Sequence, residues 1–282
     1  MAELPVLGSL LADKYRVEAV LGEGGMGTVF RARHELMDKP VAIKWLHAKL
    51  AGDATNRDRF IREAKAMARV RHANVIEVYD VGVHRGALFL VMELLEGESF
   101  EQVLQRGTMT IPRALRLLIE SMRGVAAAHG RNIIHRDIKP ENIFIVYDAL
   151  HPDGCAKVLD FGISKLLDDG PNPLRITTTG ATIGTPLYMS FEQMSGVADI
   201  DARSDVYSFG VLLYRALTGR LPFEAPFPLP STKMRLELRP ARQYVAAQRH
   251  VFPNIVVARL AHDGASRSRT VPSGCPVNGP DR

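Results

Sequence analysis

Hydrophobic and polar residues alternate over residues 15–21 and again over residues 28–32, on either side of a glycine-rich interval. Alternation of period two, with β-branched and aromatic residues, predicts a pair of β-strands. Two short apolar runs, residues 41–44 and 88–92, predict further strands. We therefore expect the first third of the chain to be built mainly on a sheet.

One helix is predicted among these strands. Residues 58–69 place Phe60 and two further apolar residues at positions i, i+4 and i+7, which indicates an amphipathic helix. Glu63 lies on the same face, where an unpaired carboxylate would be costly. Lys44, at the end of a predicted strand, is a candidate partner. Alternatively, the flexible stem of Glu63 carries its carboxylate to water.

The pattern changes to helices after about residue 100. Residues 111–129 repeat apolar side chains with a 3.6-residue period, and Gly130 is placed to end that helix. A second helix is predicted over residues 204–217, with Ser204 as N-cap and Gly219 just past its end. Apolar residues cover almost its whole circumference, so we expect it to be buried on every side.

The composition is that of a soluble globular protein. Of the 282 residues, 46% are apolar and 24% are charged. Apolar runs stay well short of 18 residues, and the first dozen residues lack the order of a signal peptide, so we expect a cytoplasmic protein without a membrane span. The two cysteines, Cys155 and Cys275, exclude a disulfide scaffold and lack the spacing of a zinc site.

The charge is concentrated in the tail. Residues 225–282 contain nine Lys or Arg and three Asp or Glu, a net charge of +6, whereas the other 27 basic and 28 acidic residues leave the preceding part at −1. The tail also holds eight of the 17 prolines. A basic tail raises the alternative of nucleic-acid binding, but no nucleic-acid-binding fold accompanies it, and we expect no such partner.

The glycine-rich interval contains Gly22, Gly24 and Gly27 between the first two predicted strands. Glycines allow backbone N–H groups to approach phosphate oxygens closely, although an ordinary hairpin turn would look similar. A dinucleotide-binding fold is not favoured, because the residues after Gly27 are poor helix starters.

Two polar motifs follow in the helical half. Residues 135–142 hold five ionisable residues and an asparagine between apolar pairs, which fits a fixed loop whose carboxylate, lysine and amide converge, although a solvated turn is the alternative. Asp160 ends a short apolar strand beside Phe161 and Gly162, and its carboxylate, with Asn142, would suit a hard cation.

Taken in order, these motifs resemble the protein kinase signature set, and in particular the bacterial branch of the eukaryotic-type (Hanks-type) Ser/Thr kinases, over about residues 15–224. The motifs are Gly22-x-Gly24-x-x-Gly27-x-Val29, Val41-Ala42-Ile43-Lys44, Glu63, His135-Arg136-Asp137 with Asn142, and Asp160-Phe161-Gly162.

The resemblance implies an α+β, bilobal kinase-like fold: an N-terminal antiparallel sheet with one helix, and a mainly helical C-terminal lobe that is truncated. The expected divisions are an N-terminal extension at 1–14, an ATP-binding N-lobe at 15–95, an incomplete C-lobe at 96–224, and a basic, Pro- and Arg-rich, poorly ordered tail at 225–282.

The same resemblance implies transfer of the γ-phosphoryl group of ATP, with Mg²⁺ or Mn²⁺, to Ser or Thr hydroxyls. Asp137 would accept the proton of the hydroxyl, and Lys139 would steady the transferred group. Lys44, held by Glu63, would pair with the α- and β-phosphates. The implied metal ligands are Asn142 and Asp160. The implied ATP-binding residues are Leu21, Gly22, Gly24, Gly25, Gly27, Val29, Ala42, Lys44, Glu93, Leu95 and Phe144.

The resemblance also implies regulation through the loop that follows Asp160. Autophosphorylation at Thr177 or Thr179 would order this loop against the cations of Arg136 and Lys165. The expected partners are protein substrates with Ser or Thr, and a second copy of the chain through autophosphorylation or dimerisation. In addition, Thr185 resembles a threonine that contacts the catalytic aspartate, and Asp205 resembles an aspartate that braces the catalytic loop.

Two features depart from the family. Ser190-Phe191-Glu192 stands where Ala-Pro-Glu is usual, and no pattern of the family's further helices follows residue 226. The alternative function is therefore a truncated, inactive module that binds or regulates other proteins.

Overall fold

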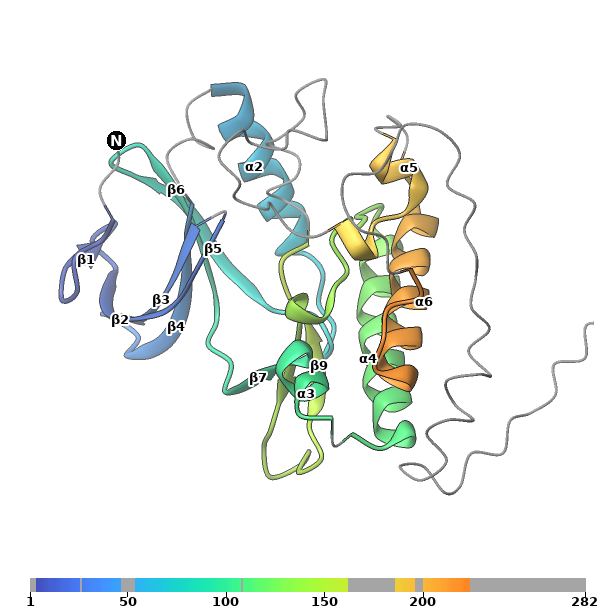
Figure 1. Ribbon diagram of the computed structural model, residues 1–282. Coiled ribbons are helices and arrows are strands. Elements are labelled where there is room, and N and C mark those ends of the chain that lie inside the picture. The colour runs from blue at the N-terminus through green and yellow to red at the C-terminus, as the bar shows by residue number, and fades with distance from the viewer. Residues whose placement is uncertain are drawn as a thin grey trace, which may run out of the picture.

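The computed structural model describes residues 4–25, 27–46, 54–107, 109–161, 186–195 and 200–223 of the chain. Two lobes are visible in Figure 1: a curled sheet with helix α2 beside it, and a second lobe containing α4 and α6. This arrangement confirms the predicted α+β, two-lobed architecture. The expected tail at 225–282 lies outside the described residues.

The first lobe is a six-stranded antiparallel sheet with strand order β1-β2-β3-β4-β6-β5. Its strands are β1 (Leu10–Leu11), β2 (Tyr15–Gly24), β3 (Gly27–His34), β4 (Lys39–Leu46), β5 (Val78–His84) and β6 (Ala87–Glu93). Strand β1 lies in the segment expected to precede the lobe, yet Leu11 pairs with Tyr15 and is buried, so the N-terminal extension contributes to the sheet.

Alternation along the strands divides the sheet into two faces. Val41, Ile43 and Trp45 of β4 belong to one buried cluster, together with the corresponding residues of β6. Leu46 belongs to another cluster, which includes residues of α2 (Ala54–Met67). Because Lys44 alternates with Ile43 and Trp45, its side chain projects on the α2 side of the sheet.

The second lobe combines helices with a small sheet. The strands β7, β8 and β9 are antiparallel and lie in that order. The elements are β7 (Gly97–Ser99), α3 (Phe100–Gln105), α4 (Ile111–His129), the short helix η1 (Pro140–Asn142), β8 (Ile143–Val146), β9 (Cys155–Val158), the short helix η3 (Pro186–Tyr188), α5 (Phe191–Met194) and α6 (Ala202–Thr218).

The ends of the long helices test the capping predictions. Helix α4 has the predicted bounds, with Gly130 as its C-cap. Helix α6 ends at the predicted Gly219, which adopts a left-handed conformation at φ 73°. Its predicted N-cap was wrong: Asp201 accepts from the N–H of Arg203, and the helix begins at Ala202. The hydroxyl of Ser204 is instead bonded inside the lobe.

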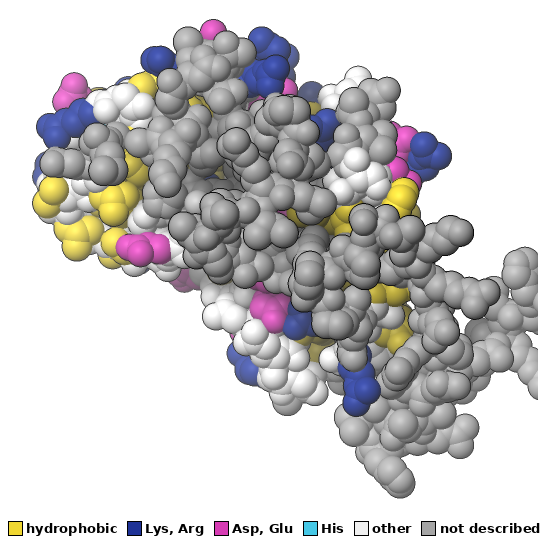
Figure 2. Space-filling model, turned by 45° about the horizontal axis from the view of Figure 1, so that its top comes forward, with side chains coloured by type: hydrophobic (Ala, Val, Ile, Leu, Met, Phe, Trp, Pro, Cys, Tyr) yellow, Lys and Arg dark blue, Asp and Glu magenta, His cyan; other side chains and the backbone are white. Residues whose placement is uncertain are grey.

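Helix α6 is not buried on every side. Its apolar residue Phe209 is packed in the core, but Val206 is 58% exposed. Hydrophobic side chains are visible at the surface near α6 and, separately, over the β1 and β2 side of the sheet (Figure 2). Val6, shortly before β1, is 73% exposed. Among the described helices, none is long and apolar enough to cross a membrane.

The connecting segment and backbone bonds of β9 both link the two lobes. Residue Glu93, at the end of β6, begins the connecting segment, and its N–H donates to the carbonyl of Glu77 at 3.0 Å. Behind it, Val158 of β9 donates to the carbonyl of Asn74, and Ile76 donates to the carbonyl of Val158. These backbone bonds fix β9, and therefore the residues that follow it, against the base of the sheet.

Candidate active site

The glycine motif forms the hairpin between β2 and β3. Gly24 pairs with Gly27 across the turn, and a Cβ on Gly27 would lie 2.0 Å from the carbonyl oxygen of Trp45, so only glycine fits there. At Gly22 a Cβ would meet nothing within 4 Å, and the backbone does not adopt a left-handed conformation. Protein packing therefore does not require glycine at residue 22, whereas close approach of a phosphate would benefit from it.

The residues predicted to surround an adenine lie beneath this hairpin. Val29, Ala42 and Leu95 join one apolar cluster with Met92. Phe144 lies on β8 and pairs with Ser99 of β7, the strand that follows the connecting segment. Of the other predicted nucleotide-binding residues, Leu21 and Gly22 lie at the end of β2, and both are exposed.

The Glu93 side chain stabilises the connecting segment. Its Oε1 accepts from the ammonium of Lys157 at 2.7 Å and from the N–H of Glu77 at 2.8 Å. Because the N–H of Glu93 already donates to Glu77, this N–H is not available to an adenine in this conformation.

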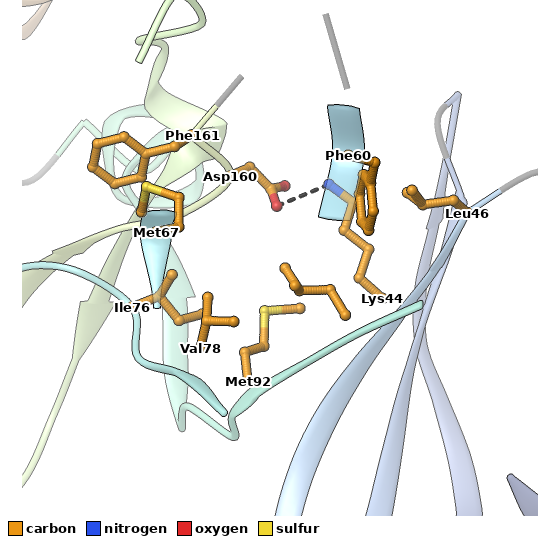
Figure 3. A pocket seen from close by; sticks show the side chains of 10 residues that line it. Lys44, Leu46, Phe60, Met67, Ile76, Val78, Met92, Asp160 and Phe161 are labelled. Carbon is orange, nitrogen blue, oxygen red and sulfur yellow. Dashed lines mark ion pairs between the residues drawn. The ribbon is translucent and has the colours of Figure 1, made fainter. Parts of the chain in front are cut away.

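A pocket between the sheet and α2 contains the first pair of charged residues (Figure 3). Lys44 donates from Nζ to Oδ1 of Asp160 at 2.8 Å, and its side chain is 13% exposed. The rest of the lining is apolar: Leu46, Phe60, Met67, Ile76, Val78, Leu90, Met92 and Phe161.

Glu63 does not take the predicted place in this pocket. It is partly buried on α2, but no ion pair between Lys44 and Glu63 occurs in the part of the chain that the structure describes. The predicted pairing is therefore absent from this conformation, in which the ammonium group of Lys44 pairs with the carboxylate of Asp160. Phe60 and Met67 of the same helix line the pocket.

The predicted catalytic loop is fixed from below by Asp205 of α6. Its carboxylate, 1% exposed, accepts from the N–H of His135 and from the N–H of Arg136, both at 2.8 Å. It also bonds Nε2 of His129 at 2.7 Å. Arg136 has a φ of 62°, a costly conformation for a side chain that carries a Cβ, and these bonds hold it there. The predicted brace is confirmed.

His135 is the buried centre of this loop. Its Nε2 lies 2.8 Å from the carbonyl of Leu159, which can only accept, and its Nδ1 accepts from the N–H of Asp137 at 3.2 Å. These bonds define the neutral tautomer that is protonated on Nε2. Burial lowers the pKa of His135. Its ring also packs against Phe161, with ring centroids 4.6 Å apart, so the loop and the Asp160 turn support each other.

Two predicted catalytic residues and one predicted metal ligand lie together in the loop that follows His135. The Oδ2 atom of Asp137 accepts from Nζ of Lys139 at 2.9 Å and from Nδ2 of Asn142 at 3.0 Å. Nδ2 of Asn142 also donates to the Asp137 carbonyl, so the loop closes on itself. The side chain of Asp137 is 18% exposed.

The predicted metal ligands fit a hard cation. Asn142 uses its nitrogen for both bonds to Asp137, which leaves its amide oxygen for other contacts, and its carbonyl accepts from the N–H of Leu159. Asp160 follows directly, at φ 48°. No group of three His, Cys, Asp or Glu residues forms a metal cage among the described residues. Two oxygen ligands supplemented by substrate phosphates are typical of Mg²⁺ sites.

Comparison with known proteins agrees with this geometry. The sequence model of the protein kinase domain matches residues 15–249, which is most of the chain and extends beyond the expected end near residue 224. The chain belongs to the protein kinase domain family. It is similar to serine/threonine-protein kinase pkn3 of Myxococcus xanthus, with 46% identity over 221 residues, and to serine/threonine-protein kinase PknL of Mycobacterium bovis, with 40% identity over 234 residues.

These matches cover 78% and 83% of this kinase domain chain, but the chain spans only 40% and 56% of the two relatives. The crystal structure of the Mycobacterium tuberculosis PknI kinase domain is similar in fold, with a TM-score of 0.64 at 26% identity. That match covers 87% of this chain and 90% of the other. The bilobal kinase fold expected from the motifs is thereby confirmed.

In this kinase domain, local hydrogen bonds form the turn at Ser190-Phe191-Glu192, where the sequence departs from the family. Ser190 caps α5: its Oγ accepts from the N–H of Gln193, whose side chain accepts in return from the N–H of Ser190. Phe191 occupies the first position of this helix and is 71% exposed. The turn is therefore retained without the proline of the family.

Several residues of the site were not predicted. Gln193 donates to the carbonyl of Arg136 at 2.7 Å, and Lys157 bonds Glu93. His129, the last residue of α4, bonds Asp205, and this contact was not predicted either. These contacts join segments far apart in sequence, so periodicity carried no indication of them. The predicted Lys165, Thr177, Thr179 and Thr185 lie outside the described residues.

Proposed function

We propose that this chain transfers the γ-phosphoryl group of ATP to Ser or Thr hydroxyls of proteins. The observation that carries the proposal is the carboxylate of Asp137, whose Oδ2 accepts from both Lys139 and Asn142. The backbone of Asn142 is bonded in turn to Leu159, the residue before Asp160. Family membership and the bacterial serine/threonine-protein kinases among its relatives support it.

In the proposed reaction, the bond between the γ-phosphorus and the oxygen that leaves with ADP breaks, and a bond from the substrate hydroxyl oxygen to that phosphorus forms. Asp137 accepts the hydroxyl proton through its carboxylate, which Lys139 and Asn142 hold in a fixed orientation. Lys139, already beside that carboxylate, neutralises charge on the transferred group. Such catalysis rests on positioning and on neutralisation of phosphate charge.

Nucleotide binding is assigned to the residues around the hairpin and the pocket. Lys44 would contact the α- and β-phosphates, and backbone N–H groups of the hairpin would cover them. The cluster containing Val29 and Ala42 would enclose the adenine. Magnesium or manganese bound by Asp160 and Asn142 would supply neutralisation of phosphate charge. Because Lys44 and Asp160 pair with each other in this structure, both must exchange this partner when nucleotide binds.

We also propose that the chain phosphorylates its own loop at Thr177 or Thr179, with Arg136 and Lys165 as binding sites for the new phosphate. Its partners would be proteins with accessible Ser or Thr, including a second copy of the chain. Nucleic acid and membranes are not proposed as partners. A cytoplasmic location follows from the need for ATP.

The alternative is an inactive kinase-like module. One observation favours it: Lys44 pairs with Asp160 rather than with Glu63. The match of the kinase domain beyond the expected boundary, to residue 249, speaks for the enzyme.

The experiment is phosphoryl transfer from labelled ATP and Mg²⁺ to myelin basic protein by the purified chain. We expect transfer by the wild type and a loss of roughly 1,000-fold or more in Asp137→Asn, whose amide cannot accept the proton. Asp137→Asn should keep the rise in melting temperature that MgATP produces, because it does not remove a phosphate or metal ligand. Absence of transfer by folded, monodisperse wild type would overturn the proposal.

A further inference from the structure

Side chains hold the peptide groups on both sides of Asp137. Its N–H donates to Nδ1 of His135 at 3.2 Å, and its carbonyl accepts from Nδ2 of Asn142 at 2.8 Å. The carbonyl of the preceding residue, Arg136, accepts from Nε2 of Gln193 at 2.7 Å. The peptide unit between Arg136 and Asp137 is therefore bonded at both of its polar groups, by His135 at the N–H and by Gln193 at the carbonyl.

This peptide unit follows a residue in a costly conformation. Arg136 has a φ of 62°, a region that a residue with a Cβ adopts only when its surroundings hold it there. The Oδ1 atom of Asp205 accepts from the N–H of Arg136 at 2.8 Å, and Gln193 holds the carbonyl. Loss of either bond would favour relaxation of Arg136, and the residue that would shift with it is Asp137.

The amide of Gln193 matches two different backbone groups. Its Oε1 accepts from the N–H of Ser190 at 3.1 Å, while its Nε2 donates to the carbonyl of Arg136. A backbone N–H can only donate and a carbonyl can only accept, so the two contacts fix the orientation of the amide. The carboxylate of a glutamate could replace the first contact but not the second, because it has no N–H to donate.

The start of α6 anchors both bonds to Arg136. Ser190 donates from Oγ to Oγ of Ser204 at 3.1 Å, and these two serines are 1% and 5% exposed. Asp205, the next residue of α6, binds the N–H of Arg136. Gln193 and Asp205 therefore reach Arg136 from places that the same turn of α6 holds relative to each other.

We propose that Gln193 is a positioning residue for phosphoryl transfer: by holding the carbonyl of Arg136, it fixes the carboxylate of Asp137 relative to the substrate hydroxyl. The inference rests on the proposed kinase function and adds one residue to that site. Gln193 is partly buried and does not line the nucleotide pocket, so we expect it to act on the transfer step and not on the binding of ATP. A small displacement of a general base lowers the rate of the chemical step steeply.

The test measures kcat, KM for ATP and KM for myelin basic protein in Gln193→Glu of the full chain. We expect kcat to fall about tenfold or more, while both KM values change less than twofold. The melting temperature should stay within about 4 °C of the wild type, because glutamate at the third position of a helix serves the capping box as glutamine does. A role confined to capping α5 would leave kcat unchanged.

Ser190→Ala is the matched control. It removes the hydroxyl that caps α5 and bonds Ser204, but it keeps the backbone N–H that donates to Gln193. We expect a lower melting temperature with kcat within about twofold of the wild type. If Ser190→Ala lowered kcat as much as Gln193→Glu does, the stability of the α5 turn, and not the bond to Arg136, would account for the loss.

A double variant shows whether Gln193 acts through Asp137. Asp137→Asn removes the proton acceptor, so the placement of this side chain no longer matters to its residual transfer. Adding Gln193→Glu should then lower that residual rate less than twofold, although the same change costs tenfold or more in the wild-type background. Equal losses in the two backgrounds would overturn the proposal, since Gln193 would then act on another group.

The outcomes also separate this inference from the proposed function. If the folded wild type transfers no phosphate, the proposed function fails and the positioning role fails with it. If the wild type is active and Gln193→Glu retains its kcat, only the positioning role fails. Should Gln193→Glu not fold, Gln193→Met, which also lacks the donor but brings no charge, provides the same comparison of kcat with the two KM values.

Discussion

The ammonium group of Lys44 and the carboxylate of Asp160 neutralise each other across the pocket, at 2.8 Å. The two residues come from opposite lobes, and each has a different proposed task, one with phosphates and the other with a metal ion. The ion pair therefore holds both side chains in the pocket, and the charge of each compensates the charge of the other. Under the proposed function we expect MgATP to weaken this ion pair, since phosphates would bind Lys44 and the metal ion would bind Asp160, and a second carboxylate could then also pair with Lys44.

Glu63 is the carboxylate on α2 that can take this role. We expect Glu63→Gln to leave the melting temperature of the nucleotide-free protein within about 2 °C of the wild type, because Glu63 forms no ion pair with Lys44 in the described conformation. The same change should lower the rate of phosphoryl transfer about 100-fold, because we expect the pair of Lys44 with Glu63 to form in the reacting state. Calorimetry and initial rates provide the two measurements.

The control for this prediction is Glu35→Gln, since Glu35 pairs with Arg16 on the surface and both its stability and its rate should stay close to wild type. A fully active Glu63→Gln would show that Lys44 needs no partner on α2. A large loss of melting temperature without nucleotide would show instead that Glu63 supports the resting structure.

Local patterns predicted the secondary structure well. The bounds of α4 and the end of α6 at Gly219 follow from periodicity and capping, which involve residues close in sequence. The N-cap of α6 was misplaced because Asp201 and Ser204 are both good caps. Tertiary structure decided between them, since Ser204 bonds Ser190 of another segment.

In the candidate site, only the residues that belong to sequence motifs were predictable. The motifs singled out Asp137, Asn142 and Asp160, and in the structure Asn142 bonds Asp137 and also Leu159, the neighbour of Asp160. The Lys44 partner was not predictable, because two carboxylates compete for one ammonium group and the positions of the lobes decide between them. The pair of Glu101 with Arg215 is set by contact between two helices, which no spacing in the sequence reveals.

The exposed Phe191 provides a second prediction. It occupies the first position of α5, where proline is favoured, and the preceding Ser190 has φ −68° and ψ 161°, the extended conformation that a following proline prefers. We therefore expect Phe191→Pro to keep the free energy of unfolding or to raise it by up to about 1 kcal/mol. Urea denaturation measures this, and phosphoryl transfer should continue.

Gln193→Pro, two positions further on, is the contrasting variant. It removes the N–H that Ser190 caps and the side chain that bonds Arg136, so both stability and transfer should fall. If Phe191→Pro were destabilised by more than about 1 kcal/mol, the aromatic ring would have a packing role that its exposure does not indicate.

The third prediction concerns pH and His135. Its pKa in the folded protein is lowered by burial from an ordinary value of 6.5, so below pH 6.5 the unfolded chain binds a proton that the folded chain does not. This histidine therefore reduces stability as the pH falls from about 6.5 toward its folded pKa, by at most about 1.4 kcal/mol per pH unit. Protonation would also remove the acceptor for the N–H of Asp137.

His135→Gln tests this directly. Glutamine keeps a donor and an acceptor but does not titrate, so the variant should be less stable than wild type at pH 7.5, yet lose less stability between pH 6.5 and pH 5. Urea denaturation at several pH values gives the two slopes. Equal slopes for the wild type and His135→Gln would contradict this prediction, because the buried imidazole would then take up a proton as readily as an exposed one. The bonds of His135 to Leu159 and Asp137 oppose that uptake.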